Sequence, residues 1–559
     1  MGTKVNSNYE DLITFTRASA GHALRPVSYG TELVSNGTFD TDSDWTKLSG
    51  STISGGKGHI VSTGSFVSLA QNIGAVTGKI YFVTIDVTVN SGAGVYIGIG
   101  GGTTDSRRFE APTTGSYAVA VVAGPTDTGV QITRRAATDT DVDNISVKEV
   151  TFDVGNNLVL FEHPDGIPRV EWDSAGNRLG LLVEEARTNL VPYSDFSSDW
   201  NEVRSTLTAN QAVSPDGTQI AVEIVEDALT DPHYINDVIT ATASAQHTLS
   251  VYVKQGSGNR SALLRTSNEG SDDYIIFDFA TETITETGSG TSNATSQSVG
   301  NGWYRIAFTY TQSGDTSSGI LIGLSNSTTP SNSLPSYTGD GTSSIYVYGA
   351  QFEQGSFPTS YIKSNSGSTT SRSADVASIP VADFGYNNSN ECTLFCHISG
   401  MSYEDGGTGY PIVTRLDNAS NANDRRGFFV SESSESLRSE VVFGGSGQAG
   451  LTVTTSSGGS FGDVKMAFAM AENDFAVSGN GGAVETDTSG TVASSLPINK
   501  LVIALSSASL NGHIKSIQYY PRRLTNAQLQ ALTEPRSTPT LSLTFDGQES
   551  SYKENYIHG

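Results

Sequence analysis

The sequence predicts an all-β chain built from several separate β-sandwiches. Short runs of β-branched and aromatic residues alternate with Gly, Asn, Ser and Thr along the whole chain, whereas apolar residues at helical spacing are scarce. The 22 Tyr, 22 Phe and 4 Trp residues provide large side chains for true cores, although only 36% of the residues are hydrophobic. Because 559 residues exceed what one core supports, we expect about three to five domains.

The overall charge argues against several classes of partner. The net charge is −26, and a surface this acidic repels phosphate backbones, so we expect no nucleic-acid binding. No apolar run approaches the roughly 18 residues of a membrane-spanning helix. The first residues are polar and do not resemble a secretion signal. We therefore expect a protein made in a cytoplasm, without membrane insertion.

Two short strings organise the first part of the chain. The first, Thr-Phe-Thr-Arg-Ala-Ser, spans residues 14–19 and includes an expected strand. The second, Gly-Leu-Leu-Val-Glu-Glu-Ala-Arg-Thr-Asn-Leu, spans residues 180–190 and follows the turn sequence Asp-Ser-Ala-Gly-Asn. Apolar runs on both sides of that turn predict a β-hairpin.

Together the two strings resemble a family of bacteriophage tail and fibre proteins. In that family the second string joins a virion-proximal part to carbohydrate-binding-like β-sandwiches, and a Pro-Arg segment closely follows the first string. Here the Pro-Arg segment that leads into the second string lies at residues 166–170, far beyond the first string. We therefore predict that residues 33–150 are a domain inserted into a split N-terminal anchor module, which consists of residues 1–32 and 151–189.

Residues 33–150 and 190–362 share one plan. Each begins with Leu-Val and continues to a Phe and a Trp, namely Phe39 and Trp45 in the first and Phe196 and Trp200 in the second. The first and last strands expected for 33–150 resemble those of carbohydrate-binding jelly rolls found beside glycoside hydrolases. The resemblance implies two tandem jelly rolls. Residues 363–372 follow as a flexible linker by composition.

The last part of the chain predicts a third sandwich over residues 373–535. A final strand is followed by a short helix, for which Thr525 or Asn526 can act as N-cap with Leu529 and Leu532 facing inward. This ending resembles concanavalin A-like (laminin-G-like) domains. Residues 536–559 form a polar C-terminal tail.

The two cysteines are predicted to be buried free thiols. Cys392 and Cys396 flank Leu394 on an expected strand, where positions i and i+4 share a face but lie roughly 13 Å apart. This separation is too large for a disulfide. A metal site with the neighbouring His397 is the alternative, but nothing nearby supplies further ligands.

Two aspartate triplets are the candidate metal ligands. One follows the first strand of the inserted domain and the other precedes its last strand. Hard oxygen ligands at alternate positions suit Ca²⁺, and a structural Ca²⁺ lies beside the chain ends in the jelly rolls that this domain resembles. The alternative is that they are ordinary solvated turn residues. The six residues are Asp40, Asp42, Asp44, Asp139, Asp141 and Asp143.

Five tyrosines in polar, loop-like surroundings are the candidate glycan-binding residues, because sugars bind aromatic platforms beside amides and acids. Each could instead be a half-buried packing residue. Trp45, Trp200 and Trp303 lie beside strand signals and are expected in cores. The five tyrosines are Tyr234, Tyr274, Tyr337, Tyr403 and Tyr410.

These features lead to three functional hypotheses. The first is a phage tail fibre or tail-associated adhesin in the virion, which binds host-surface glycans, contacts other tail proteins and forms a homo-oligomer, with a trimer favoured for avidity. The second is a purely structural decoration or fibre-shaft protein. The third is a polysaccharide depolymerase. A complete P-loop and a complete Glu-x-Asp-x-x-Glu strand are missing from the sequence, so we expect no enzymatic activity and no cofactor other than Ca²⁺.

Overall fold

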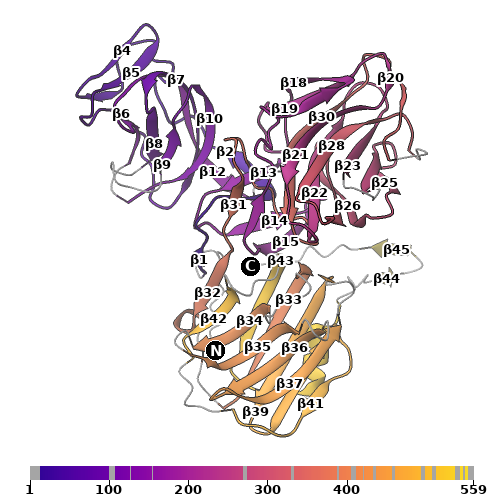
Figure 1. Cartoon of the computed structure of the whole chain (residues 1–559). Helices are drawn as coiled ribbons and strands as arrows, with labels where there is room; N and C mark the ends of the chain where they lie inside the picture. The colour runs from indigo at the N-terminus through magenta and orange to yellow at the C-terminus, as the bar shows by residue number, and fades with distance from the viewer. Residues whose placement is uncertain are drawn as a thin grey trace.

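The chain folds into three β-sandwiches around a common junction (Figure 1). No helix among the described residues is long and apolar enough to cross a membrane. The computed structural model describes residues 13–99, 108–125, 128–153, 155, 157–267, 273–328, 333–384, 386, 390–403, 411–418, 421–431, 436–455, 460–492, 498–505, 511–535, 542–545 and 548–551.

The inserted sandwich is formed by β3 to β12 and encloses a core that includes Val83, Ile85, Ile97 and Ile132. Its first sheet contains, in spatial order, β3 (Thr46–Leu48), β6 (Ser68–Asn72), β11 (Gly129–Arg134), β8 (Val95–Ile99) and β9 (Arg108–Ala111). Its second sheet contains β10 (Gly115–Val122), β7 (Ile80–Gly92), β12 (Thr138–Phe152), β2 (Gly21–Tyr29) and β13 (Leu158–His163), with β5 (Lys57–Ser62) on β12 and β4 (Ser51–Ser54) on β5.

The second sandwich repeats this two-sheet arrangement around a core that includes Ile235, Leu264, Phe308 and Ile322. One sheet contains β17 (Asn201–Val203), β21 (His233–Thr240), β28 (Ser317–Ser325), β23 (Ser261–Ser267), β24 (Tyr274–Asp278) and β25 (Thr283–Thr287). The other contains β18 (Ser205–Ala212), β19 (Ala221–Glu226), β30 (Ser344–Gln354), β22 (Gln246–Gln255), β27 (Trp303–Thr311) and β26 (Ser292–Gly300).

The C-terminal sandwich encloses the largest core, in which Leu394, Phe428 and Phe468 are fully buried. One sheet contains β1 (Thr14–Thr16), β32 (Val376–Pro380), β42 (Lys500–Ala504), β34 (Ile412–Asn418), β35 (Asn421–Ser431), β36 (Ser436–Phe443) and β37 (Ser446–Thr455). The other contains β14 (Arg169–Trp172), β15 (Arg178–Val183), β43 (Asn511–Tyr520), β33 (Cys392–Ser402), β39 (Val464–Ala471), β40 (Asp474–Gly479) and β41 (Glu485–Asp487), with β38 (Ser460–Phe461) on β33.

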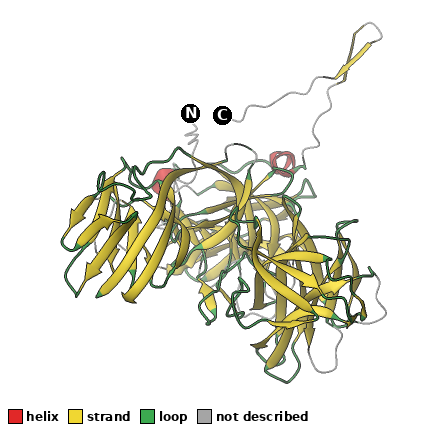
Figure 2. Ribbon diagram, turned by 90° about the horizontal axis from the view of Figure 1, so that it is seen from above, coloured by secondary structure: helices red, strands yellow, loops and turns green. Residues whose placement is uncertain are grey.

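Short elements complete the fold. Helix α1 (Asn526–Thr533) packs on β39 and β40, and Thr525 caps it as predicted, in a reciprocal capping box with Gln528. A 3₁₀ turn, η2, covers Val381–Asp383. Figure 2 shows the hairpin β44–β45 standing away from the sandwiches. The two-stranded sheets are β16 (Arg187–Asn189) with β31 (Thr370–Arg372), β20 (Thr230–Asp231) with β29 (Tyr337–Thr338), and β44 (Ser542–Phe545) with β45 (Gln548–Ser551).

The predicted fold class is confirmed: the chain is all-β and contains several sandwiches. The repeated opening is also visible in space. The rings of Phe39 and Trp45 are 5.1 Å apart and those of Phe196 and Trp200 are 4.9 Å apart. Both phenylalanines have positive φ, 52° and 63°. The prediction of two buried thiols is confirmed as well, because Cys392 and Cys396 are free and buried.

The predicted anchor module, residues 1–32 with 151–189, is not a separate sheet in the structure. Strand β1 pairs with β32, and β15 pairs with β43, so both belong to the C-terminal sandwich. Strands β2 and β13 pair with each other and extend the sheet of the inserted sandwich through β12. The pairing partners lie far away in the sequence, which is why local patterns did not indicate them.

The segment predicted as a flexible linker, residues 363–372, is packed against the body of the protein. Its last residues form β31 on β16. Ser364 and Arg372 are each only 1% exposed, and Ser364 accepts and donates hydrogen bonds with Ser194. Both ends of the segment therefore have partners on the body of the protein, whereas residues 365–369 between them are exposed.

Candidate functional site

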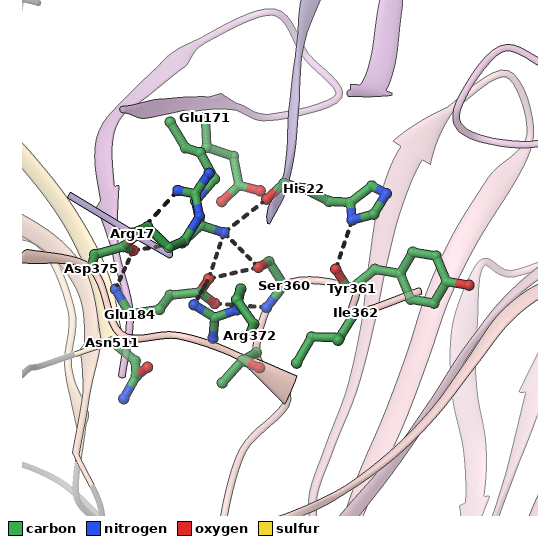
Figure 3. A network of polar contacts seen from close by, with 12 residues as sticks. Arg17, His22, Glu171, Glu184, Ser360, Tyr361, Ile362, Arg372, Asp375 and Asn511 are labelled. Atoms are coloured by element: carbon green, nitrogen blue, oxygen red, sulfur yellow. Dashed lines mark hydrogen bonds and ion pairs between the residues drawn. The ribbon is translucent and has the colours of Figure 1, made fainter. Parts of the chain in front are cut away.

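Five charged side chains meet in a buried group at the junction, which we call the central ion cluster (Figure 3). Arg17 lies 3.2 Å from Asp375. Arg169 bridges Asp375 at 2.6 Å and Glu184 at 2.7 Å. Arg372 lies 3.1 Å from Glu184. These contacts join β14 and the ends of β1, β15 and β32 of the C-terminal sandwich to β31. Arg169 also donates to the carbonyl of His22 on β2, and Glu184 accepts from Ser360, which follows the second sandwich.

Burial makes the electrostatics of this cluster strong. Desolvation alone would raise the pKa of Glu184, but the guanidinium groups of Arg372 and Arg169 outweigh it and hold the pKa well below its usual range. Ser360 adds two hydrogen bonds to the same carboxylate, both 2.6 Å long. For Arg17, burial and the neighbouring Arg169 lower the pKa to about 10. The cluster thus holds its charges by mutual pairing in a nearly dry interior.

The central ion cluster gathers the strings that stood out in the sequence. Arg17 comes from the first string, Arg169 from the Pro-Arg segment and Glu184 from the second string. We did not predict this cluster. Its signal was the presence of charged residues inside short, otherwise apolar strings that are widely separated in the chain. The arrangement indicates that these strings hold the sandwiches together.

The structure does not offer most of the predicted tyrosines to a ligand. Tyr274 and Tyr337 are 7% exposed and Tyr403 is 2% exposed. The hydroxyl of Tyr337 donates to the buried carboxylate of Glu226 at 2.6 Å. Tyr234 is half-buried beside the same apolar cluster as Tyr274, and Tyr410 lies outside the described residues. These rings fill cores and loop bases, so their polar sequence surroundings were a misleading signal.

Each of the six aspartates has its own hydrogen-bond or ion-pair partner in the structure. Within the described residues, no group of three or more His, Cys, Asp or Glu side chains is arranged to hold a metal ion. Strand β12 turns its three aspartates away from the core, toward side chains of the adjacent strands. The observed partners are Thr38 for Asp40, Lys47 for Asp42, Ser43 for Asp44, Asn90 for Asp139, His59 for Asp141 and the amide of Asn144 for Asp143.

A different surface of the inserted sandwich is accessible and polar. The outward-facing residues of its five-stranded sheet form two rows across the strands, and Tyr96 lies in one of them, partly exposed. The guanidinium carbon of Arg108 lies 3.6 Å from the centre of the Tyr96 ring, and that of Arg135 lies 5.5 Å away. We call this surface the Tyr96 face. Its accessible residues are Ala70, Tyr96, Gly98, Arg108, Glu110 and Gln131, whereas Ser68 and Thr133, in the same row as Tyr96, are buried.

The Tyr96 face combines a fixed ring with hydrogen-bonding groups. Gly98 stands between Gln131 and Arg108 on neighbouring strands, so the middle of the face lacks a side chain and a ligand can approach the backbone closely. Glu110 pairs with Arg135, which also donates to the carbonyl of Ala93 at 2.8 Å. Preorganised rings, amides and charged groups of this kind can contact the apolar faces and hydroxyl groups of a saccharide.

The equivalent face of the second sandwich is closed. Its strands follow in the same order, but Leu263 and Ile276 stand where the inserted sandwich has Tyr96 and Glu110. Both are at most 1% exposed, and Leu334 packs against the cluster that they form. Of the two corresponding surfaces, only the Tyr96 face can receive a polar ligand without moving part of the chain.

Comparisons with known proteins found similarity among solved structures. No family model matches the chain, and no curated protein matches it. Among solved structures, it matches the tandem domain CBM22-1-CBM22-2 of Paenibacillus barcinonensis Xyn10C with 10% identity, over 60% of this chain and 100% of that one, at a TM-score of 0.20. It also matches Trypanosoma rangeli sialidase in complex with the inhibitor DANA, with 11% identity over 92% and 94% of the two chains, at a TM-score of 0.22.

The sialidase matches correct one expectation. A second structure of the T. rangeli sialidase, with 2,3-difluorosialic acid, matches with 11% identity over 88% of this chain and 83% of that chain, at a TM-score of 0.21. The expectation that the chain has no enzymatic activity is contradicted by these matches and is withdrawn. At such low TM-scores the likeness carries neither a function nor catalytic residues over to this chain.

Proposed function

We propose that this chain is a bacteriophage virion protein, a tail fibre or tail-associated adhesin, that binds glycans of the host surface. The phage context is supported by residues 14–19 and 180–190, which resemble the tail and fibre family. Glycan binding is supported by one observation above all: the inserted sandwich keeps the Tyr96 face accessible and polar, whereas the corresponding face of the second sandwich is apolar and covered.

Binding of the full chain to host cells tests this proposal. Labelled protein is expected to bind cells of the bacterial host and to be displaced by their purified surface polysaccharide. Tyr96→Ala removes the ring beneath Arg108, so we expect binding about three- to tenfold weaker. The matched control is Val238→Ala, because Val238 is 62% exposed on the second sandwich and lies outside the Tyr96 face.

The alternatives give different outcomes. Equal binding by the wild type and the Tyr96→Ala variant would reject the Tyr96 face as the glycan site. Failure of the wild type to bind either cells or polysaccharide would favour a structural decoration or fibre-shaft protein. A fall in polysaccharide size during incubation, followed by gel filtration, would assign a glycan-degrading activity to the chain.

The proposal includes a homo-oligomer, with a trimer favoured, in contact with other tail proteins. A single shallow face binds a saccharide weakly, and several copies held together raise the overall affinity without any new contact. Light scattering of the purified chain measures the number of copies, and immunogold labelling of virions locates them on the particle.

A further inference from the structure

An open cleft of about 950 Å³ lies where the second sandwich meets the second string of the sequence. Residues 185–188 form one side, and the ends of β21 and β30 form another. The string therefore has two roles. Glu184 and Asn189 point inward, where Asn189 donates to the carbonyls of Ala350 and Ile362. The residues between them line the cleft and are not needed for the central ion cluster.

The cleft is lined mainly by groups that match sugar hydroxyls. Hydroxyl and carboxamide groups come from five different strands or strand ends, and Leu190 is the largest apolar residue of the lining. Each hydroxyl group can donate and accept hydrogen bonds. Each carboxamide group can also do both, through its NH₂ and its carbonyl oxygen. The volume falls in the range of small-ligand sites, about 300–1,000 Å³. The hydroxyl and carboxamide residues are Thr188, Thr240, Thr242, Gln246, Gln354 and Ser371.

An ion pair inside the cleft has a fixed geometry. Arg187 is 8% exposed and pairs with Glu185 at 2.5 Å. The same guanidinium donates to the carbonyl of Gln354 and lies over the ring of Phe357, 5.0 Å from its centre. Because Glu185 and Arg187 compensate each other, a charged ligand group would have to displace a partner. The pair therefore favours a neutral ligand. The carboxylate of Glu185 and the guanidinium of Arg187 can both form hydrogen bonds with vicinal hydroxyls of such a ligand.

We propose that this cleft is a second saccharide site, separate from the Tyr96 face, that takes neutral hexopyranose units. The inference rests on the proposed glycan-binding function. It extends that function to the cleft that residues 185–188 of the second string line. Two sites on one chain would contact a polysaccharide at two points, one on the inserted sandwich and one at the junction.

Saturation-transfer NMR on the full chain tests the inference, with the methyl glycosides of glucose, galactose, mannose and N-acetylglucosamine as probes. We expect a signal from at least one probe. The blocking substitutions are made in the Tyr96→Ala variant, so that the Tyr96 face does not contribute to the signal. In this background Gln246→Trp should abolish it, since Gln246 is exposed and a larger ring there fills the cleft. Thr240→Trp is a second blocking variant at another edge. Gln211→Trp, also exposed on the second sandwich but outside the cleft, is the matched control and should retain the signal.

The outcomes separate this inference from the proposed function. A signal that survives Tyr96→Ala and disappears in both blocking variants supports the cleft. A signal unchanged in both blocking variants, or lost in Tyr96→Ala, overturns it. If no probe gives a signal while the wild type still binds host polysaccharide, the cleft inference fails and the proposed function stands. If neither is observed, both fail.

Discussion

At the scale of single residues, the charged groups at the junction dominate the chemistry. Arg17, Arg169 and Arg372 face only Glu184 and Asp375 within the cluster, so three cations share two buried carboxylates. Removing one partner from a buried ion pair is much more destabilising than replacing the whole pair, because the remaining charge is left without compensation. Each carboxylate is therefore critical for stability.

We expect Asp375→Asn to reduce the free energy of unfolding by about 3–5 kcal/mol, because Arg17 and Arg169 both lose their charged partner. Urea denaturation followed by tryptophan fluorescence measures the change. Asp231→Asn is the control, since Asp231 lies 3.7 Å from Arg204 on the exposed surface, where ion pairs contribute little. Similar stabilities of the two variants would contradict the role of the cluster.

Residue patterns predicted features that lie within one strand or turn, but they did not predict contacts between distant parts of the chain. The spacing of Cys392, Leu394 and Cys396 correctly placed all three on one buried face, since alternation is a local property. Thr525 was identifiable as a helix cap for the same reason. Arg17 and Asp375, by contrast, are 358 residues apart, and no local rule connects them. Tyr274, Tyr337 and Tyr403 are buried because exposure depends on packing against distant segments, which local patterns do not indicate.

At the scale of elements, the contact between β16 and β31 decides how the C-terminal sandwich is attached. β31 pairs with β16 through Arg372 and Arg187, Ser371 and Thr188, and Thr370 and Asn189. The hydroxyls of Thr188 and Ser371 are also hydrogen-bonded, at 2.7 Å. Residues 363–372, which the composition predicts to be a flexible linker, therefore end in a strand that belongs to the junction.

This pairing should protect the end of the segment, residues 370–372, from proteases. We expect trypsin to leave the native chain uncut after Arg372, which is 1% exposed and donates to the carbonyl of Glu185. Mass spectrometry of a short digest checks the prediction. The bond after the more exposed Arg204 is the internal comparison, and digestion in urea should cut both. Release of an intact fragment starting at Ser373 from native protein would show that the segment is open.

At the scale of the whole molecule, acid is expected to weaken the joining of the sandwiches. Burial and the nearby Arg25 and Arg17 hold the pKa of His163 well below its usual value, and burial lowers that of His22. Neutral histidines in the fold take up protons on unfolding, so stability falls as the pH drops below about 6.5. Glu184, with a lowered pKa, adds a further loss below about 4.5, where its unfolded form becomes protonated.

Calorimetry between pH 8 and pH 4 measures this effect. The unfolding free energy should be nearly constant from about pH 8 to pH 7 and then fall by up to about 1.4 kcal/mol per pH unit for each histidine. Glu184→Gln should remove the additional loss below about pH 4.5, at the price of lower stability at neutral pH. A stability that does not change between pH 7 and pH 5 would show that the buried histidines do not titrate differently in the unfolded chain.

One strand gives the molecule a mechanical property. β12 runs for 15 residues, from Thr138 to Phe152, and pairs with β7 along most of this length before it pairs with β2 at its end. The inserted sandwich is thus attached by a continuous β-strand. A pull along that strand loads many backbone hydrogen bonds in shear at the same time, so they must break together. The Tyr96 face would therefore resist tension along this axis far better than a domain carried on a hinge.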